Sequence, residues 1–187
     1  MPTECQASRA WHSVVVHLSA VLVRRAAAVT MFLVVASASP AGAASINVPP
    51  SKNLGSVPTG TSTFSAQLGT VTASASGILG VAPSFTATVS ATVFRTGGGG
   101  PSETVAKASI RYWSGPATAF SGALVGGFTA GQPTAALAQD LSVARVAFSG
   151  SALAGTISAS WNPTIVINLP TSAVAGSYSG TITHSVA

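Results

Sequence analysis

Apolar and hydroxyl-bearing residues alternate along much of the chain after residue 60. In the clearest run, the odd positions of 85–93 are apolar and the even positions of 86–92 are Thr or Ser. Successive side chains of a strand point to opposite faces, so this run predicts a strand with one apolar and one hydroxyl face. Further strands are predicted at residues 64–73, 106–113, 156–161, 164–169 and 178–186.

The predicted strand at 64–73 changes phase in its middle. Apolar residues alternate from Phe64 to Leu68, and Val71 and Ala73 then follow one residue out of step. Gly69 lies at the slip, and a glycine inside a strand pattern is typical of a bulge or a bend. We therefore expect a β-bulge or a strand bend at Gly69.

Residues 137–148 fit two patterns. Leu137, Leu141, Ala144 and Phe148 would share one face of a helix that begins near residue 133. Residues 141–148, which contain two further valines, also suit a strand. We favour a loop followed by a strand.

Clusters of glycine and proline separate the predicted strands, at 49–50, 97–101, 114–116, 126–127, 131–133 and 162–163. These residues favour turns. Short strands, frequent turns, few charges and no long helical pattern predict an all-β fold. We expect a single antiparallel Ig-like β-sandwich that follows an N-terminal signal segment.

The chain opens with the pattern of a secretory signal. Arg24 and Arg25 precede an apolar run over residues 26–38 that is too short to span a bilayer, and residues 39–43 end in Ala-x-Ala. We expect residues 1–43 to be removed, leaving residues 44–187 as a secreted, extracellular β-sandwich domain.

The stretch before Arg24 is unusually long. It is either a genuine long leader or the result of a start assigned too early, with initiation at Val23.

Few charged residues remain after residue 43. Residues 44–187 contain five basic and two acidic residues, so their net charge is +3, compared with +5 for the whole chain. The charges are scattered, with no basic run, so no nucleic-acid partner is expected.

Cys5, the only cysteine, lies in the expected leader, and the domain is expected to fold without disulfides. No second apolar segment is long enough to span a membrane.

The supply of titratable side chains bears on catalysis, because general acid–base chemistry needs such a group beside the reacting bond. The only side chains of residues 44–187 that could serve this purpose near neutral pH are Glu103, Asp140 and His184. We expect no enzyme activity, no cofactor and no metal site. His184 shares its strand phase with Ile182 and Val186, which predicts a partly buried, hydrogen-bonded histidine. A pH sensor or a metal ligand would need further partners.

A binding surface is predicted on the strand at 106–113. Lys107, Arg111 and Trp113 share one phase of its alternation. If the other phase faces the core, this face presents a tryptophan beside two cations, a combination that suits a sugar ring or an anionic polymer. Alternatively, Trp113 covers the rim of the sandwich with Arg111 stacked on it. Trp161 follows the phase of its strand's apolar residues, which predicts a core position.

Two segments near the end of the chain carry a family resemblance: WNPTIVINLP at 161–170 and AGSYSGTIT at 175–183. They resemble the end of WxL-type domains, secreted β-sandwich modules of Gram-positive bacteria, and especially of their actinobacterial relatives. LGTVT at 68–72 resembles the start of such domains. The resemblance implies non-covalent attachment to the cell wall.

The chain departs from this family in its two defining Trp-x-Leu motifs. The matching places read SFTA at 84–87 and THSV at 183–186, without tryptophan. Wall binding through those tryptophans therefore does not transfer to this chain. Independently of the family, Gly176 is expected to give a tight turn its backbone freedom. Tyr178 is expected to bury its ring and bond the nearby backbone, as a tyrosine corner does.

Two functions follow from the sequence. The first is a non-catalytic cell-surface or cell-wall module, adhesive or structural, whose partner is a cell-wall polymer or another surface protein. The second is an assembly subunit, in which an exposed strand edge pairs with another copy or a partner protein.

Overall fold

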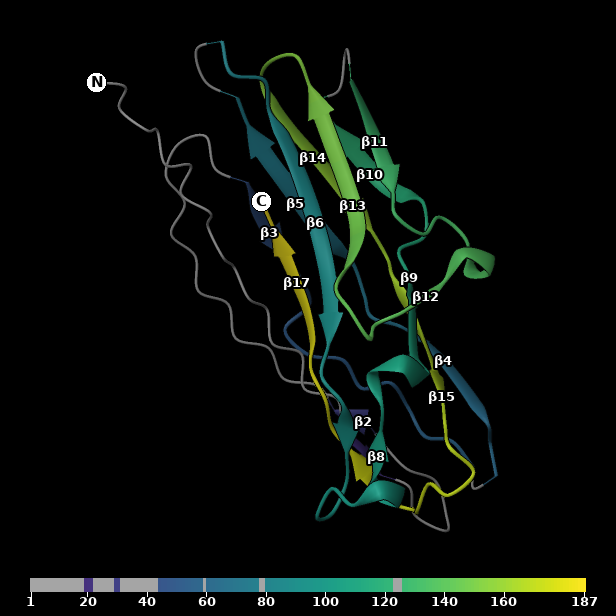
Figure 1. The fold of residues 1–187 in the computed structure, drawn as a ribbon. Coiled ribbons are helices and arrows are strands. Elements are labelled where there is room, and N and C mark those ends of the chain that lie inside the picture. The colour runs from purple at the N-terminus through teal and green to yellow at the C-terminus, as the bar shows by residue number, and fades with distance from the viewer. Residues whose placement is uncertain (1–18, 22–28, 31–43, 59, 78–79, 123–125) are drawn as a thin grey trace, which may run out of the picture.

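The computed structural model describes residues 19–21, 29–30, 44–58, 60–77, 80–122 and 126–187. These residues form an all-β fold in which antiparallel sheets pack together, as expected for a β-sandwich (Figure 1). The predicted fold class is confirmed at this level. Short 3-10 helices occur in the connections: η1 (Pro101–Glu103), η2 (Lys107–Ser109) and η3 (Ala135–Leu137).

Three four-stranded sheets make up most of the molecule, and each is named here after a central strand. The β14 sheet contains, in spatial order, β10 (Ala117–Ser121), β14 (Thr156–Trp161), β5 (Val71–Ser76) and β3 (Ser45–Asn47). The β15 sheet contains β12 (Gln139–Asp140), β9 (Ile110–Trp113), β15 (Thr164–Asn168) and β4 (Thr63–Gln67). The β6 sheet contains β11 (Gly126–Ala130), β13 (Arg145–Ala152), β6 (Ser84–Ala91) and β17 (Ile182–Val186).

Smaller pairings complete the fold. β7 (Phe94–Arg95) pairs with β8 (Thr104–Val105). β16 (Ser177–Tyr178) pairs with β1 (Ser19–Val21), which in turn pairs with β2 (Val29–Thr30). β1 and β2 belong to the expected leader, and β1 joins this hairpin to β16 in the C-terminal part of the chain. Arg24, Arg25 and residues 31–43, on which the signal prediction depends, lie outside the described residues, and so does Cys5.

The β14 and β15 sheets share three neighbouring chain segments that change sheets at the same level. β4 leads into β5, β9 into β10 and β14 into β15, each through two or three residues. The Asn162 side-chain oxygen accepts a hydrogen bond from the Gly69 amide (3.2 Å), and the Pro163 carbonyl accepts one from Leu68 (2.8 Å). The two sheets are therefore two arms of one bent surface along the length of the molecule (Figure 1).

Gly69 lies at the bend between β4 and β5. Its φ of 95° lies in the left-handed region that favours glycine, and a Cβ at this position would come 2.8 Å from Cγ of Pro49. The sequence predicted a bulge or a bend at Gly69 within one strand over 64–73. The chain does break at Gly69, but the break separates two strands, β4 and β5, that pair in different sheets.

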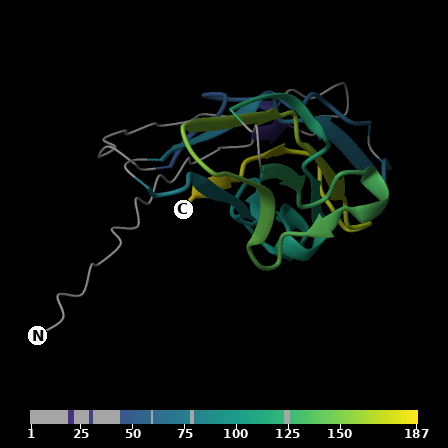
Figure 2. The ribbon, with the colours of Figure 1, turned by 90° about the horizontal axis from the view of Figure 1, so that it is seen from above.

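The core lies between the β6 sheet and the bent surface, and the view from above shows the sheets enclosing it (Figure 2). The predicted alternation holds in β6, where Phe85, Ala87 and Val89 are buried and the hydroxyl-bearing residues between them face outward. Trp161 is fully buried, as predicted, and stacks on Phe148 with ring centroids 4.8 Å apart. Burial of such apolar surface is the main source of stability in this class of fold.

Hydroxyl groups cover the outer face of the β14 sheet. Cross-strand pairs join Ser45 to Ser74 (2.8 Å), Thr72 to Ser160 (2.8 Å) and Ser121 to Ser158 (3.0 Å). Pairs of this kind stabilise neighbouring strands without charge. The four strands of this sheet contain no Lys, Arg, Asp or Glu.

Three other predictions change in detail. The strand expected over 106–113 begins only at Ile110, because η2 occupies the residues before it. The segment 137–148 is a connection followed by a strand, as favoured, although the strand starts at Arg145 and Leu137 is 53% exposed. The strand expected over 178–186 is divided into β16 and β17.

Candidate binding surface

The outer face of β9 contains two of the three predicted binding residues. Ile110 and Tyr112 are fully buried, so the alternation turns Arg111 and Trp113 away from the core. Arg111 is exposed and Trp113 is half-buried. Lys107 is also exposed, but it belongs to η2, so the expected strand phase does not relate it to the other two residues.

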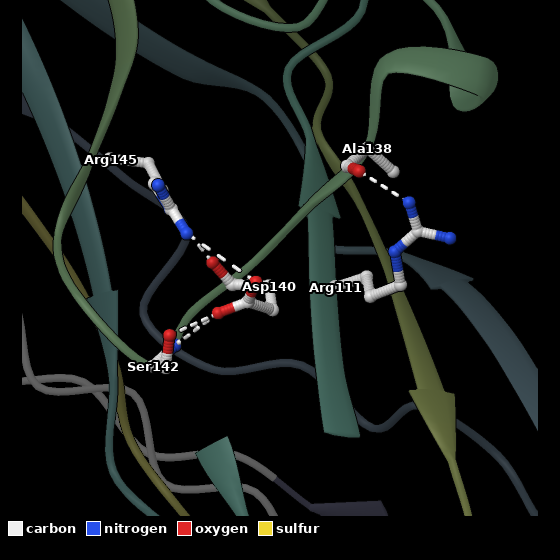
Figure 3. A network of polar contacts seen from close by, with 5 residues as sticks. All are labelled: Arg111, Ala138, Asp140, Ser142 and Arg145. Carbon is white, nitrogen blue, oxygen red and sulfur yellow. Dashed lines mark hydrogen bonds and ion pairs between the residues drawn. The ribbon is translucent and has the colours of Figure 1, made fainter. Parts of the chain in front are cut away.

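The Arg111 guanidinium reaches the residue just before the neighbouring edge strand, β12. Its Nη2 donates a hydrogen bond to the carbonyl of Ala138 (Figure 3). Arg111 also lies opposite Asp140 in the β9–β12 register. The sequence left open whether Arg111 stacks on the Trp113 ring or lies free beside it. In the structure the guanidinium bonds to a backbone carbonyl, and the Trp113 ring lies beside Gly115.

Asp140 holds the connection after β12 together (Figure 3). Its Oδ1 accepts hydrogen bonds from the Ser142 amide (3.0 Å) and the Ser142 hydroxyl. Arg145 donates from Nε to the Asp140 carbonyl (2.9 Å) and lies 3.4 Å from Oδ2 through Nη2. The hydrogen bonds from Ser142, aided by the positive charge of Arg145, lower the pKa of the Asp140 carboxyl.

Sequence reasoning had not connected Asp140 with Arg145 or with Arg111. The local signal was available in part, because an aspartate two residues before a serine favours an Asx-type turn. The pairing with Arg111 had no signal in the sequence, since it depends on β12 joining β9 at the edge of the β15 sheet. Arg145 and Asp140 form an ion pair, and Arg111 lies opposite Asp140 in the strand register; we call these three residues the arginine cluster.

A second polar network lies inside the molecule. The Trp161 indole Nε1 donates to the Tyr112 hydroxyl (3.2 Å), and that hydroxyl lies 3.2 Å from Nε2 of His184. The three side chains come from β14, β9 and β17 and are at most 2% exposed. We call them the interior chain. The burial and hydrogen bonding predicted for His184 are confirmed.

The Trp161 indole N–H can only donate, so the Tyr112 oxygen accepts from it and keeps its own proton for a second bond. The direction of the Tyr112–His184 bond depends on the histidine tautomer. The assignment that uses the Tyr112 proton is a neutral imidazole that accepts it at Nε2 and carries its own proton on Nδ1. Burial lowers the pKa of His184 to about 4, in keeping with this assignment, and raises the pKa of the Tyr112 hydroxyl. Nδ1 of His184 has no hydrogen-bond partner among the described residues.

Tyr178 is the last residue of β16. Its ring is buried, and its hydroxyl lies within hydrogen-bonding distance of the carbonyls of Val174 (2.9 Å) and Ser102 (3.1 Å). Burial raises the pKa of this hydroxyl. Gly176 has no positive φ; instead, a Cβ there would clash with the Thr96 side chain. The requirement for glycine therefore comes from a close approach and not from the backbone freedom that was expected.

Glu103, the other carboxylate after residue 43, also takes part in local structure. Glu103 Oε2 accepts a hydrogen bond from the Gly100 amide (3.0 Å) at the start of η1. Within the described part of the chain, no three His, Cys, Asp or Glu side chains are grouped so that they could hold a metal ion. Likewise, no helix among the described residues is long and apolar enough to cross a membrane.

Comparison of the chain with protein-family models, with curated proteins and with solved structures finds no match. The class that the fold defines is an antiparallel all-β protein of the β-sandwich kind.

Proposed function

We propose that this chain is a secreted, non-catalytic β-sandwich module that associates non-covalently with the cell wall or another surface partner. The leader pattern at residues 24–43 and the resemblance to WxL-type domains support export and a surface location. The observation that carries the proposal is the outer face of β9, where the exposed Arg111 lies two residues from the half-buried ring of Trp113.

A guanidinium and an aromatic ring suit an anionic polymer that contains sugars. Arg111 has five N–H donors, and the Ala138 carbonyl fixes the direction of the group through one nitrogen. Arginine binds phosphate and carboxylate groups in a planar, two-pronged geometry. An indole face stacks on the apolar face of a sugar ring in the same way that it packs on other apolar surfaces.

The state of the titratable groups supports a non-catalytic role. Glu103 caps η1, Asp140 is bonded to Ser142 and Arg145, and His184 is buried against Tyr112. Each of the three groups thus has a task in the fold, and they belong to η1, β12 and β17, which are not paired with one another.

Sedimentation with purified cell wall tests the binding surface. We expect the protein to sediment with the wall and to be released by salt, because screening weakens contacts between exposed charges. Arg111→Gln and Trp113→Ala should each reduce the bound fraction. Arg95→Gln is the matched control, since it removes the same charge from another exposed strand position. Equal loss in Arg95→Gln and Arg111→Gln would show general charge attraction instead of a site.

Export is tested separately. The culture is divided into medium, salt-washable surface material and residual cells, and the N-terminus of the recovered protein is sequenced. We expect a terminus near Ala44 in the medium or the salt wash. Recovery only from the cell interior would contradict the proposal, and peptides between residues 4 and 22 in the unprocessed precursor would exclude initiation at Val23.

A second candidate function is an assembly subunit that pairs through a strand edge. The observation that favours it is β11, an uncharged edge strand of five residues in regular register with β13. This candidate predicts oligomers that form without wall material, whereas the adhesion proposal predicts wall binding by the monomer.

A further inference from the structure

The edge strands on the two sides of the sandwich differ in how open they are to further pairing. On one side, β3 and β17 are the last strands of the β14 and β6 sheets, and they contact each other. β3 has only three residues and is followed shortly by Pro49 and Pro50, which donate no backbone hydrogen bond. Short strands and prolines are common means of blocking further pairing at a sheet edge. This side is therefore closed.

On the other side, the two sheets end in β10 and β11, which follow each other in the chain (Figure 1). Neither strand contains a charged residue or a proline. β11 is hydrogen-bonded to β13 along its whole length, and no described strand pairs with its other side. We call this the β11 edge.

The other sheet edges are less suited to pairing. β10 has an irregular register between Ala117 and Ala119, which disturbs its outer row of backbone groups. β12 has two residues, one of them the charged Asp140. Residues 52–56, which include Lys52, share a hollow with the last two residues of β4. β4 matches β11 in length, regular register and absence of charge, but its last two residues border that hollow, whereas no described strand borders the outer side of β11.

Aromatic side chains adjoin the β11 edge. Phe128 of β11 lies between Phe85 of the core and Phe120 of β10, with ring centroids 6.3 and 5.6 Å away. Phe120 is 68% exposed. Exposed apolar side chains next to open backbone groups mark a surface that is only partly complete in the isolated chain. A lipid surface fits it poorly, because backbone groups of an open edge would lose their hydrogen bonds in hydrocarbon.

We propose that the β11 edge pairs antiparallel with the β11 edge of a second copy, so that two β6 sheets join across a two-fold axis. An antiparallel edge is complementary to itself, because each copy offers the same alternation of N–H and C=O groups. Charge does not oppose a second copy at this place. The chain carries a net positive charge, and its basic residues after position 43 all lie outside β10 and β11. Two copies can thus meet here without bringing like charges together.

This inference rests on the second candidate function and names its partner. The test uses the protein as its producing cell processes it, with sedimentation equilibrium over a wide range of concentrations. We expect a dimer that dissociates on dilution. Thr129→Lys places a charge on an exposed position of β11 and should weaken the dimer by roughly tenfold or more. Thr86→Lys is the matched control, because it adds the same charge to an exposed position of β6, a central strand of the same sheet.

Two further measurements keep the test decisive. Mixing Thr129→Lys with Thr129→Glu should restore a dimer, since opposite charges then meet across the axis. In the unaltered protein, amide hydrogen exchange at 126–130 should slow as concentration rises, while exchange in β6 should not change.

A wild-type protein that stays monomeric at the highest concentration overturns the inference, as does a dimer that Thr129→Lys and Thr86→Lys affect equally. Monomeric protein that pairs through β11 with a different strand-bearing protein also overturns it. Cell-wall sedimentation is independent of these outcomes, so failure here leaves the adhesion proposal to its own test.

Discussion

The interior chain and the arginine cluster are both polar networks that connect strands, yet their surroundings differ. Trp161, Tyr112 and His184 link three strands and are at most 2% exposed. The arginine cluster joins β9, β12 and β13 at the surface, where the side chains of Arg145 and Asp140 are 29% and 39% exposed. Water competes for the contacts in the arginine cluster but not for those in the interior chain, so loss of a contact should cost more free energy of unfolding in the interior chain.

The largest expected effect concerns Trp161, which belongs to the interior chain and also stacks on Phe148. Trp161→Ala removes apolar volume and the donor to Tyr112, and it should lower the free energy of unfolding by about 3–5 kcal/mol. Urea denaturation measures this change. Trp113→Ala is the matched control on the surface next to the arginine cluster, and its smaller cost would sharpen the comparison. Equal costs would contradict it.

The next effect is a pH dependence caused by His184. Its pKa is about 4 in the folded state, whereas an exposed histidine in the unfolded chain has a pKa of 6.5. Below pH 6.5 the unfolded chain takes up a proton that the folded chain does not, so stability should fall as the pH drops towards 4. The full loss from this group is about 3 kcal/mol. Above pH 6.5 it contributes no pH dependence.

His184→Gln isolates this dependence, because the amide oxygen can accept from Tyr112 and does not titrate. The difference between the stability curves of the two proteins should be constant above pH 6.5 and should change between pH 6.5 and 4. A difference that is flat over this range would mean that His184 takes up its proton equally in both states, and that the interior chain is open to water.

A smaller effect is expected when only the central hydroxyl is removed. Tyr112→Phe keeps the ring but leaves the Trp161 N–H and His184 Nε2 without their partner, at a cost of about 1–3 kcal/mol in the free energy of unfolding. Tyr178→Phe is the matched control, since its hydroxyl bonds backbone carbonyls in a more exposed place. Thermal and urea unfolding of both variants would show whether burial makes the difference.

The two networks also differ in how far the sequence predicts them. The alternation that places Trp161 and His184 on inward phases is a local pattern, and it correctly predicts that both are buried. Their meeting at Tyr112 depends on strand packing across the sandwich, which no local pattern contains. Likewise, Gly69 signals a break in the chain, but only the pairing partners decide whether the break is a bulge or a change of sheet.

On the surface, prediction was weaker for a physical reason. The face of β9 that contains Arg111 and Trp113 follows from alternation, whereas Lys107 falls in η2, where the strand period does not apply. Exposed residues are also less constrained by packing, so their partners depend on which edge strand arrives beside them. β12, with two residues, is too short for its pairing with β9 to be predicted from periodicity.

The smallest expected effect comes from the arginine cluster. Because hydrogen bonds from Ser142 hold the pKa of Asp140 below its usual value, its carboxylate stabilises the folded state above the unfolded pKa, and this contribution is lost as the pH falls through the folded pKa. Asp140→Asn should therefore lower the melting temperature slightly at neutral pH and low salt. The difference should shrink with added salt and disappear in acid, because screening and protonation each remove the charge effect. A loss as large as that of Tyr112→Phe, unchanged by salt, would show that the arginine cluster is shielded from solvent and that exposure does not separate the two networks.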